Sequence, residues 1–295
     1  MENKIYLNDL VSLEKFGKNI KLVRHYDSRI KLNNDMGTFK EFVKFDLLEE
    51  YQSYQSKDVF NCDYIASFYG EENSKAIFYG IYKVIHKGKN APKPSEKFMK
   101  YWNEMNINEE TYFYELEELP EYRKFKDRIV IKWGEGSSTR SWHQWFSSDK
   151  RKEVIEIRPE NFIGEYPGWK NVILDHFDLK RMISNPDSHR NWYDELSKVS
   201  AVYAIVDKSN GNVYIGSAYG DAEGLWGRWA TYANRPTGGN QLLIELEKIN
   251  DRFYEQFQYC ILEILPRGIR KEDIIGLEQL TKRKLGQKVC ILNAN

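Results

Sequence analysis

Three tyrosines and an arginine in the last third of the chain have the residue types that act on a phosphate group. Tyr203 and Tyr214 are 11 residues apart, and Arg228 and Tyr232 follow at a spacing that places them on one face of a helix. A guanidinium group has a permanent charge and forked donors that suit a phosphate. A phenol has an unperturbed pKa of about 10, so it needs a nearby cation to act as a base at neutral pH. Together these side chains can bind an anion such as a phosphate group and transfer a proton.

A β-hairpin followed by a helix is predicted to position these side chains. The runs 201–206 and 212–216 are β-branched and aromatic, and Asn210-Gly211 lies between them. Asn-Gly supplies the positive φ angles that a tight hairpin turn needs, so the pattern predicts two antiparallel strands with one tyrosine in each. Two tyrosines in a hairpin are also a common packing pair, and the order of further elements decides between these interpretations.

Several elements occur in order along the last third of the chain. They are Ala201-Val202-Tyr203, Tyr214-Ile215-Gly216, Arg228 at the start of a helix, Glu278 in the helical stretch IIGLEQLTKRK, and Asn293 in ILNAN. This order resembles the GIY-YIG nuclease family, with alanine in place of the first glycine. The resemblance implies a small domain with a three-stranded antiparallel sheet flanked by helices.

The resemblance also implies the activity and the role of each residue. The family hydrolyses phosphodiester bonds with Mg²⁺ or Mn²⁺, and Glu278 would be the single protein ligand of that metal. One of the two hairpin tyrosines, with Tyr203 as the first choice, would orient or deprotonate the attacking water. Arg228 would bind the scissile phosphate, Tyr232 would transfer a proton or bind phosphate, and Asn293 would hold water or phosphate near the metal.

A basic cluster follows the predicted metal ligand. It consists of Lys282, Arg283, Lys284 and Lys288. Cations at the end of a helix are favoured by the helix dipole, so a solvated helix terminus is one interpretation. The position of the cluster beside Glu278 favours the other interpretation, which is contact with DNA phosphates.

The residues before the hairpin predict a different kind of domain. Short strand-like runs with few long helices predict a β-rich domain, and the stretch SFYGEENSKAIFYGIYKV resembles strand–turn–strand segments of PUA-like domains, which form barrels. The segment WGEGSSTRSWHQWF places Trp142, Trp145 and Arg140 in a setting rich in glycine and serine. Tryptophans are commonly core residues, but indoles in such a segment can also stack on a base, so these three residues are candidates for DNA binding.

Length and composition bound the organisation of the chain. The 295 residues predict a mixed α/β (α+β) chain with a DNA-recognition domain over 1–160, a helical connector over 161–197 and a nuclease domain over 198–295. The connector stretch VILDHFDLKRMIS is predicted to be helical. The net charge is zero, the three cysteines are scattered, and the sequence has neither an apolar run for a membrane span nor a secretion signal at its charged start. These features predict a cytoplasmic protein with no membrane partner.

The sequence therefore predicts a metal-dependent DNA endonuclease that acts in restriction or anti-phage defence on double-stranded DNA, including base-modified DNA. Double-strand cleavage with one metal site per chain would require a homodimer on DNA or sequential nicking. Three alternatives stay open: a sequence-specific restriction or repair nuclease, a nucleic-acid-binding module with an inactive nuclease domain, and an RNA-directed reader.

Overall fold

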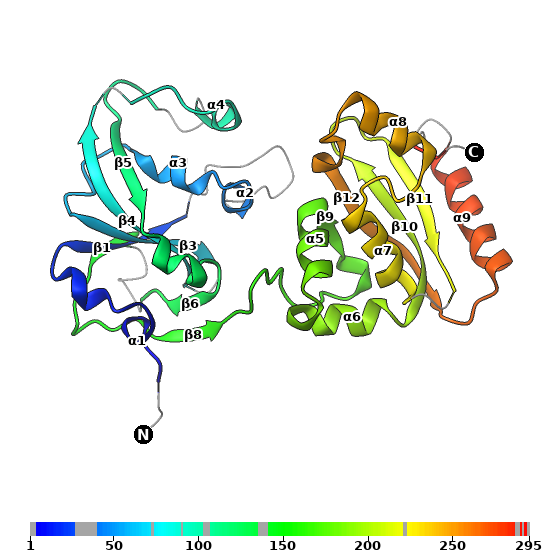
Figure 1. Cartoon of the computed structure of the whole chain (residues 1–295), viewed down its shortest axis with the longest axis horizontal. Helices are drawn as coiled ribbons and strands as arrows, with labels where there is room; N and C mark the ends of the chain where they lie inside the picture. The colour runs from blue at the N-terminus through cyan, green and yellow to red at the C-terminus, as the bar shows by residue number, and fades with distance from the viewer. Residues whose placement is uncertain are drawn as a thin grey trace. The chain divides into compact units, whose positions relative to one another are not determined.

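The chain folds into two compact units, each with helices and strands. In the computed structural model these units are Met1–Arg158 and Pro159–Asn295 (Figure 1). The mixed α+β class predicted from the sequence is confirmed. The structure describes residues 4–26, 40–71, 74–89, 91–102, 107–134, 141–220, 223–286, 290, 292 and 293.

The first unit is built on one curled sheet. Its strands are β1 (Ile20–His25), β2 (Tyr54–Gln55), β3 (Tyr64–Glu71), β4 (Lys75–Gly88), β5 (Tyr112–Glu118), β6 (Ile129–Lys132), β7 (His143–Trp145) and β8 (Val154–Ile157). Its helices and 3-10 turns are α1 (Leu7–Val11), η1 (Leu13–Phe16), α2 (Lys40–Lys44), α3 (Leu48–Ser53), α4 (Glu96–Trp102) and η2 (Pro120–Phe125).

The long strand β4 organises this sheet. The strand order is β2-β5-β4-β3-β1-β7, and β6 pairs with both β4 and β8. Strand β1 runs parallel to β3, whereas β7 pairs antiparallel to β1 at the end of the order. Alternate residues of β3 enter two separate cores, with Ile65 and Tyr69 in one and Ala66 and Phe68 in the other. The sheet therefore has a core on each face.

The second unit contains a smaller, fully antiparallel sheet. Its strands are β9 (Ile173–Asp175), β10 (Val199–Asp207), β11 (Val213–Ala218) and β12 (Phe257–Pro266). Its helices and 3-10 turns are η4 (Trp169–Asn171), α5 (His176–Ser184), η5 (Pro186–His189), α6 (Arg190–Leu196), α7 (Gly224–Asn234), α8 (Gln241–Ile249), η6 (Phe253–Gln256) and α9 (Lys271–Leu285).

Strand order places β11 at one edge of this sheet and β9 at the other, in the sequence β11-β10-β12-β9. The three predicted strands are present, and β9 is an additional fourth strand. It lies in the stretch 172–184 that was predicted to be helical throughout. Here the helix begins only at His176, because the Asp175 side chain caps it by accepting a hydrogen bond of 2.9 Å from the backbone N–H of Asp178. The segment 161–197 thus belongs to the second unit rather than forming a separate connector.

Helices cover both faces of the second sheet. Along β10, Tyr203 and Ile205 pack with Trp229 of α7, whereas Val202 and Ala204 pack with Ile274 of α9. This alternation follows from the period of two residues in a strand. As a result, α7 and α9 lie on opposite faces, and residues that project from them can meet only around the edge strand β11.

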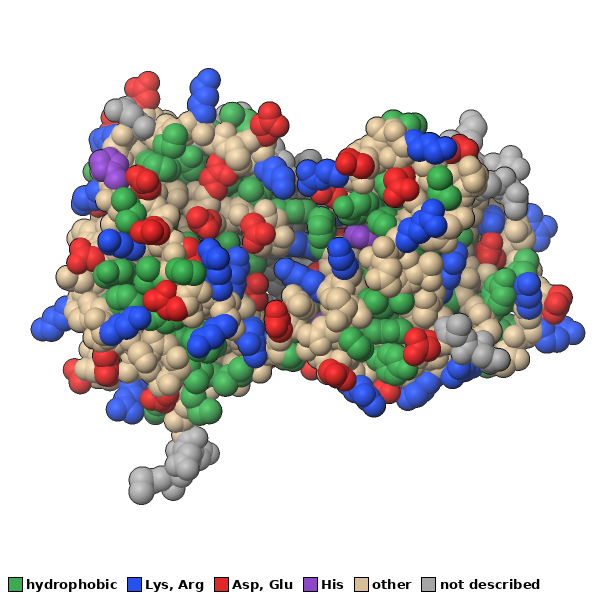
Figure 2. All heavy atoms as spheres, viewed as in Figure 1, with side chains coloured by type: hydrophobic (Ala, Val, Ile, Leu, Met, Phe, Trp, Pro, Cys, Tyr) green, Lys and Arg blue, Asp and Glu red, His purple; other side chains and the backbone are tan. Residues whose placement is uncertain are grey.

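The surface carries both signs of charge. Figure 2 shows lysine and arginine interspersed with aspartate and glutamate on the visible face of both units, as expected for a chain with a net charge of zero. Within the described residues, no helix has the length and apolar character that crossing a membrane requires.

Candidate active site

The hairpin brings its two motif strands into direct register. Strands β10 and β11 pair antiparallel, and Tyr203 lies opposite Gly216. A Cβ atom added at Gly216 would lie 2.5 Å from the Tyr203 hydroxyl oxygen and 2.7 Å from a ring carbon of Tyr214. Only glycine leaves room for both rings, which gives a packing reason for the glycine that ends the second triplet.

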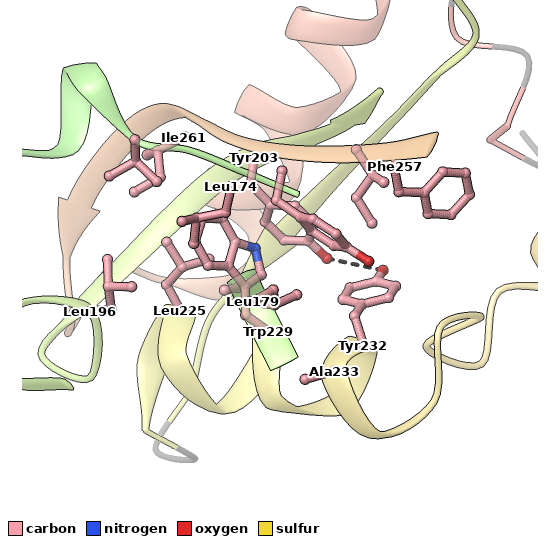
Figure 3. Packing of buried hydrophobic residues seen from close by; sticks show 14 of the residues in the cluster. Leu174, Leu179, Leu196, Tyr203, Leu225, Trp229, Tyr232, Ala233, Phe257 and Ile261 are labelled. Atoms are coloured by element: carbon pink, nitrogen blue, oxygen red, sulfur yellow. Dashed lines mark hydrogen bonds between the residues drawn. The ribbon is translucent and has the colours of Figure 1, made fainter. Parts of the chain in front are cut away.

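Arg228 is held by two phenols. Its Nε donates a 3.0 Å hydrogen bond to the Tyr203 hydroxyl, and its Nη2 donates a 3.0 Å bond to the Tyr232 hydroxyl. The two hydroxyl oxygens are 3.2 Å apart, and Figure 3 shows this contact as a dashed line among the buried residues of the core. The predicted helical face with Arg228 and Tyr232 is therefore confirmed, and both side chains point toward the hairpin.

Arg228, Tyr203 and Tyr232 form a cluster whose protonation is set largely by burial. Tyr203 and Tyr232 have no accessible surface, and burial raises the pKa of both phenols well above their usual value. Burial works against the charge of Arg228, but the neighbouring phenols Tyr203 and Tyr232 prevail and raise its pKa. At neutral pH the cluster is one guanidinium cation held by two neutral hydroxyl groups. The two buried phenols therefore hold the guanidinium group of Arg228 in place through their hydroxyl oxygens.

Glu278 approaches the same region from the opposite face of the sheet. It lies on α9, where its Oε2 accepts a hydrogen bond from Ser217 Oγ of β11 and its Oε1 lies 2.7 Å from Lys282 Nζ. The side chains of Glu278 and Lys282 are only 16% and 12% exposed, so the pair is largely shielded from solvent. Sequence analysis did not select Ser217, although its place on the β11 face opposite to Tyr214 could have indicated it.

A cavity of about 420 Å³ joins the two faces around the edge of β11. Its lining includes Tyr214, Ser217, Arg228 and Glu278, together with Thr231. Four chemically suitable side chains from three elements therefore converge on one space. Tyr203 and Tyr232 do not line it, so Tyr214, which is half-buried, is the motif tyrosine with access to a ligand. The sequence-based preference for Tyr203 beside the attacking water is not supported by this geometry.

Asn293 has a different place from the predicted one. Its Oδ1 accepts a 2.9 Å hydrogen bond from the Ile215 N–H, and its Nδ2 donates a 2.7 Å bond to the Ile215 carbonyl oxygen. The amide thereby pairs with the outer edge of β11, which has no strand partner among the described residues. It is not among the described residues that line the cavity, so it holds the strand that carries Tyr214 rather than a bound group.

The residues of the predicted basic cluster have different surroundings on α9. Lys282 pairs with Glu278, whereas Arg283 and Lys284 are exposed in the last turn of the helix. Lys288 lies outside the described residues. Of the four predicted phosphate-binding residues, only Lys282 contacts the candidate site in the part of the chain that is described.

Metal-binding capacity depends on Glu278. Within the described ranges, no cluster of three or more His, Cys, Asp or Glu side chains has metal-binding geometry. His176 and His189 are buried and hydrogen-bonded to Tyr259 and to the backbone of Asn185, respectively. A single carboxylate with a neighbouring hydroxyl suits Mg²⁺, which keeps most of its water ligands and needs few protein oxygens.

The predicted DNA-binding residues of the first unit differ in how exposed they are to solvent. Trp142 is half-buried and its ring lies near those of Phe60 and His25, so it belongs to the core periphery. Trp145 is 50% exposed. Arg140 lies outside the described residues. Of the two described tryptophans in this set, Trp145 therefore presents the more accessible indole.

Comparison of the chain with protein-family models, curated proteins and solved structures finds no match.

Proposed function

We propose that the second unit is a metal-dependent endonuclease that hydrolyses phosphodiester bonds in DNA. The observation that carries this proposal is the cavity in which Tyr214, Arg228 and Glu278 meet at the edge of β11. A fixed cation, an accessible phenol and a carboxylate are the groups that bind a phosphate, orient water and hold a divalent metal. The resemblance to the GIY-YIG motifs supports the same conclusion.

Arg228 would bind the scissile phosphate. Two of its N–H groups donate to Tyr203 and Tyr232, and the remaining ones can donate into the cavity that the side chain lines. Because the phenols fix the guanidinium group before substrate arrives, little reorganisation accompanies the build-up of negative charge on phosphorus.

Tyr214 would orient the attacking water through its hydroxyl group, and Glu278 would hold the metal, with Ser217 fixing one carboxylate oxygen. The bound Mg²⁺ or Mn²⁺ supplies charge stabilisation and lowers the pKa of a coordinated water. The ammonium group of Lys282 forms an ion pair with the other carboxylate oxygen of Glu278 and must move when a metal cation binds to that oxygen. Lys282 can then reach a DNA phosphate with its flexible side chain.

The proposal is tested by Glu278→Gln, with Glu272→Gln on an exposed part of the same helix as the matched control. Nicking of supercoiled plasmid DNA in Mg²⁺ or Mn²⁺ should be lost in Glu278→Gln and retained in the control. Equal nicking by wild type and Glu278→Gln would overturn the assignment of the site.

The biological role that fits this activity is restriction of foreign DNA in anti-phage defence, with the first unit in DNA recognition. Cleavage of phage DNA with modified bases, compared with unmodified DNA of the same sequence, tests this role. Equal rates on both substrates would exclude recognition of modification.

The alternative of an inactive binding module has one sequence feature in its favour, the alanine at position 201. In the structure Ala201 is buried in the core and lies opposite Ala218, so this replacement removes no group from the cavity. The plasmid assay separates the alternatives, because a binding module would retain DNA affinity without metal-dependent nicking.

A further inference from the structure

The first unit has a larger cavity, of about 780 Å³, with an unusual concentration of positive charge. Five of its described lining residues are lysine or arginine, and one, Glu153, is acidic. Glu153 lies 3.0 Å from Lys4 Nζ, so its charge is already balanced. In a chain with a net charge of zero, this local excess indicates a polyanionic ligand. The lysines and arginine are Lys4, Lys132, Lys150, Arg151 and Lys152.

The segment between β7 and β8 presents three of these cations and is anchored at both sides. Lys152 donates hydrogen bonds to the Trp133 carbonyl oxygen and, at 2.8 Å, to Gln144 Oε1, while its own carbonyl oxygen accepts a 2.8 Å bond from Leu7. The guanidinium group of Arg151 lies 5.2 Å from the centre of the Tyr6 ring. Lys150 and Arg151 are exposed next to this anchor. Their charged groups therefore lie on a fixed backbone and remain accessible.

Trp145 lines the same cavity and supplies an aromatic surface. It lies opposite Lys21 on β1, and the ammonium group of Lys21 is 4.6 Å from the centre of the indole ring. Lys21 is only 4% exposed, whereas Trp145 is 50% exposed, so the indole keeps accessible surface beside the buried ammonium group. His143, two residues earlier on the same strand, also lines the cavity.

We infer that this cavity binds an unpaired nucleotide of a nucleic acid, with the base stacked on Trp145 and the flanking phosphates on Lys150 and Arg151. The inference rests on the proposed function in one respect, since it names the feature of DNA that the first unit recognises. The volume of the cavity, about 780 Å³, is within the range of about 300–1,000 Å³ that small-ligand sites occupy, so the cavity has room for one nucleotide.

The aromatic side chain decides between a nucleic acid and an acidic peptide. Cations alone would serve either ligand, since both are polyanions. An accessible indole that lines the same cavity as exposed cations instead suits the flat bases and phosphates of an unpaired strand, where stacking contributes about 1–3 kcal/mol per base. An unpaired or extruded base is required because a base inside a duplex does not expose its face.

The experiment measures binding by fluorescence anisotropy with the full chain in the presence of a chelator. The probes are a fluorescein-labelled duplex with a single bulged base and the fully paired duplex of the same sequence. The variants are Lys150→Glu/Arg151→Glu, Trp145→Ala and Trp145→Phe. The matched control is Lys93→Glu/Lys97→Glu, which makes the same change of charge at exposed residues that line neither cavity.

The double charge reversal should weaken binding of both probes at least about tenfold and lower the slope of log Kd against log salt by about 2, because roughly one counterion is released per phosphate contact. Trp145→Ala should weaken binding of the bulged duplex about tenfold and leave the paired duplex unchanged. Trp145→Phe should retain most of the preference for the bulge.

Three outcomes would overturn the inference. They are equal affinity of the two double variants, an unchanged preference for the bulge in Trp145→Ala, and displacement of both probes by polyglutamate at the same charge concentration as unlabelled DNA. Since binding is measured without metal, loss of cleavage in Glu278→Gln leaves these outcomes unaffected. Failure of the nuclease proposal and failure of this inference are thus separable.

Discussion

Arg228 in the second unit and Arg151 in the first unit both line a cavity, but the protein holds their guanidinium groups in different ways. Arg228 donates to two fully buried phenols, and Glu278 is the one carboxylate among the described residues that line its cavity. Arg151 stands over one ring at the surface and shares its cavity with four lysines. The first arrangement fixes the direction of hydrogen-bond donors, whereas the second supplies charge with little direction.

This difference matches two kinds of task. Stabilising charge that develops at one atom requires donors that are already in place, because reorganisation would consume the gain. Retaining a polyanion requires many exposed cations, whose effect is strong at low salt and screened at high salt. Under the two proposals, the cavity of the second unit would carry out the reaction and the cavity of the first unit would bind the nucleic acid.

The comparison is tested most strongly by exchanging each arginine for lysine. Arg228→Lys keeps the charge but loses the fork that contacts both phenols, so DNA cleavage should fall about a hundredfold. Arg151→Lys should change the affinity of the full chain for DNA by less than about twofold, because a point charge serves equally well there. Plasmid nicking and anisotropy measure the two effects. Similar sensitivity of both arginines to this exchange would remove the distinction.

The rigidity of the Arg228 cavity in the second unit is tested by Gly216→Ala. The added methyl group would meet the Tyr203 hydroxyl at 2.5 Å, so overpacking should lower the free energy of unfolding of the second unit by about 1–3 kcal/mol. Gly276→Ala on α9 is the control, since nothing lies within 4 Å of the added atom, and it should stabilise the helix by about 0.5–1 kcal/mol.

Urea unfolding followed by circular dichroism measures both glycine variants. Equal stability of Gly216→Ala and wild type would show that the rings have room to move, and the phenols could then not fix Arg228 as described.

The smallest effect is expected from Lys282→Met, which removes the ammonium group from Glu278. A cation at Glu278 no longer has to displace Lys282, so Mn²⁺ affinity should rise by about fivefold, which corresponds to about 1 kcal/mol. Lys284→Met, which removes an exposed charge of the same helix, is the control. Electron paramagnetic resonance of free Mn²⁺ reports the affinity without any cleavage. Reduced affinity in Lys282→Met would indicate that Lys282 positions Glu278 instead of competing with the metal.

Short-range patterns predicted much of the second unit. The strand runs around Asn210-Gly211 correspond to β10 and β11, and the spacing of Arg228 and Tyr232 corresponds to their common face on α7. By contrast, the fourth strand β9 was missed, because its three residues continue directly into α5 and carry no turn signal of their own. Strand β9 exists because β12 offers it an edge, and that edge is a property of the folded sheet.

The roles of individual site residues depended more on packing. Tyr203 and Tyr214 have the same residue type and similar local sequence, but β10 is central and β11 is an edge strand, so only Tyr214 reaches the cavity. In the same way, Asn293 binds the backbone of Ile215, and the basic lining around Trp145 is assembled from segments far apart in the chain.

The amino-acid sequence by itself determined which local elements form and which side chains share a face of each element, because backbone preferences and residue periodicity act over a few positions. Only the tertiary structure decided which phenol is buried, that Glu278 and Arg228 line one cavity at the edge of β11, and where positive charge gathers in the first unit. These properties depend on strand order and on the burial of whole elements, which arise from contacts between distant segments.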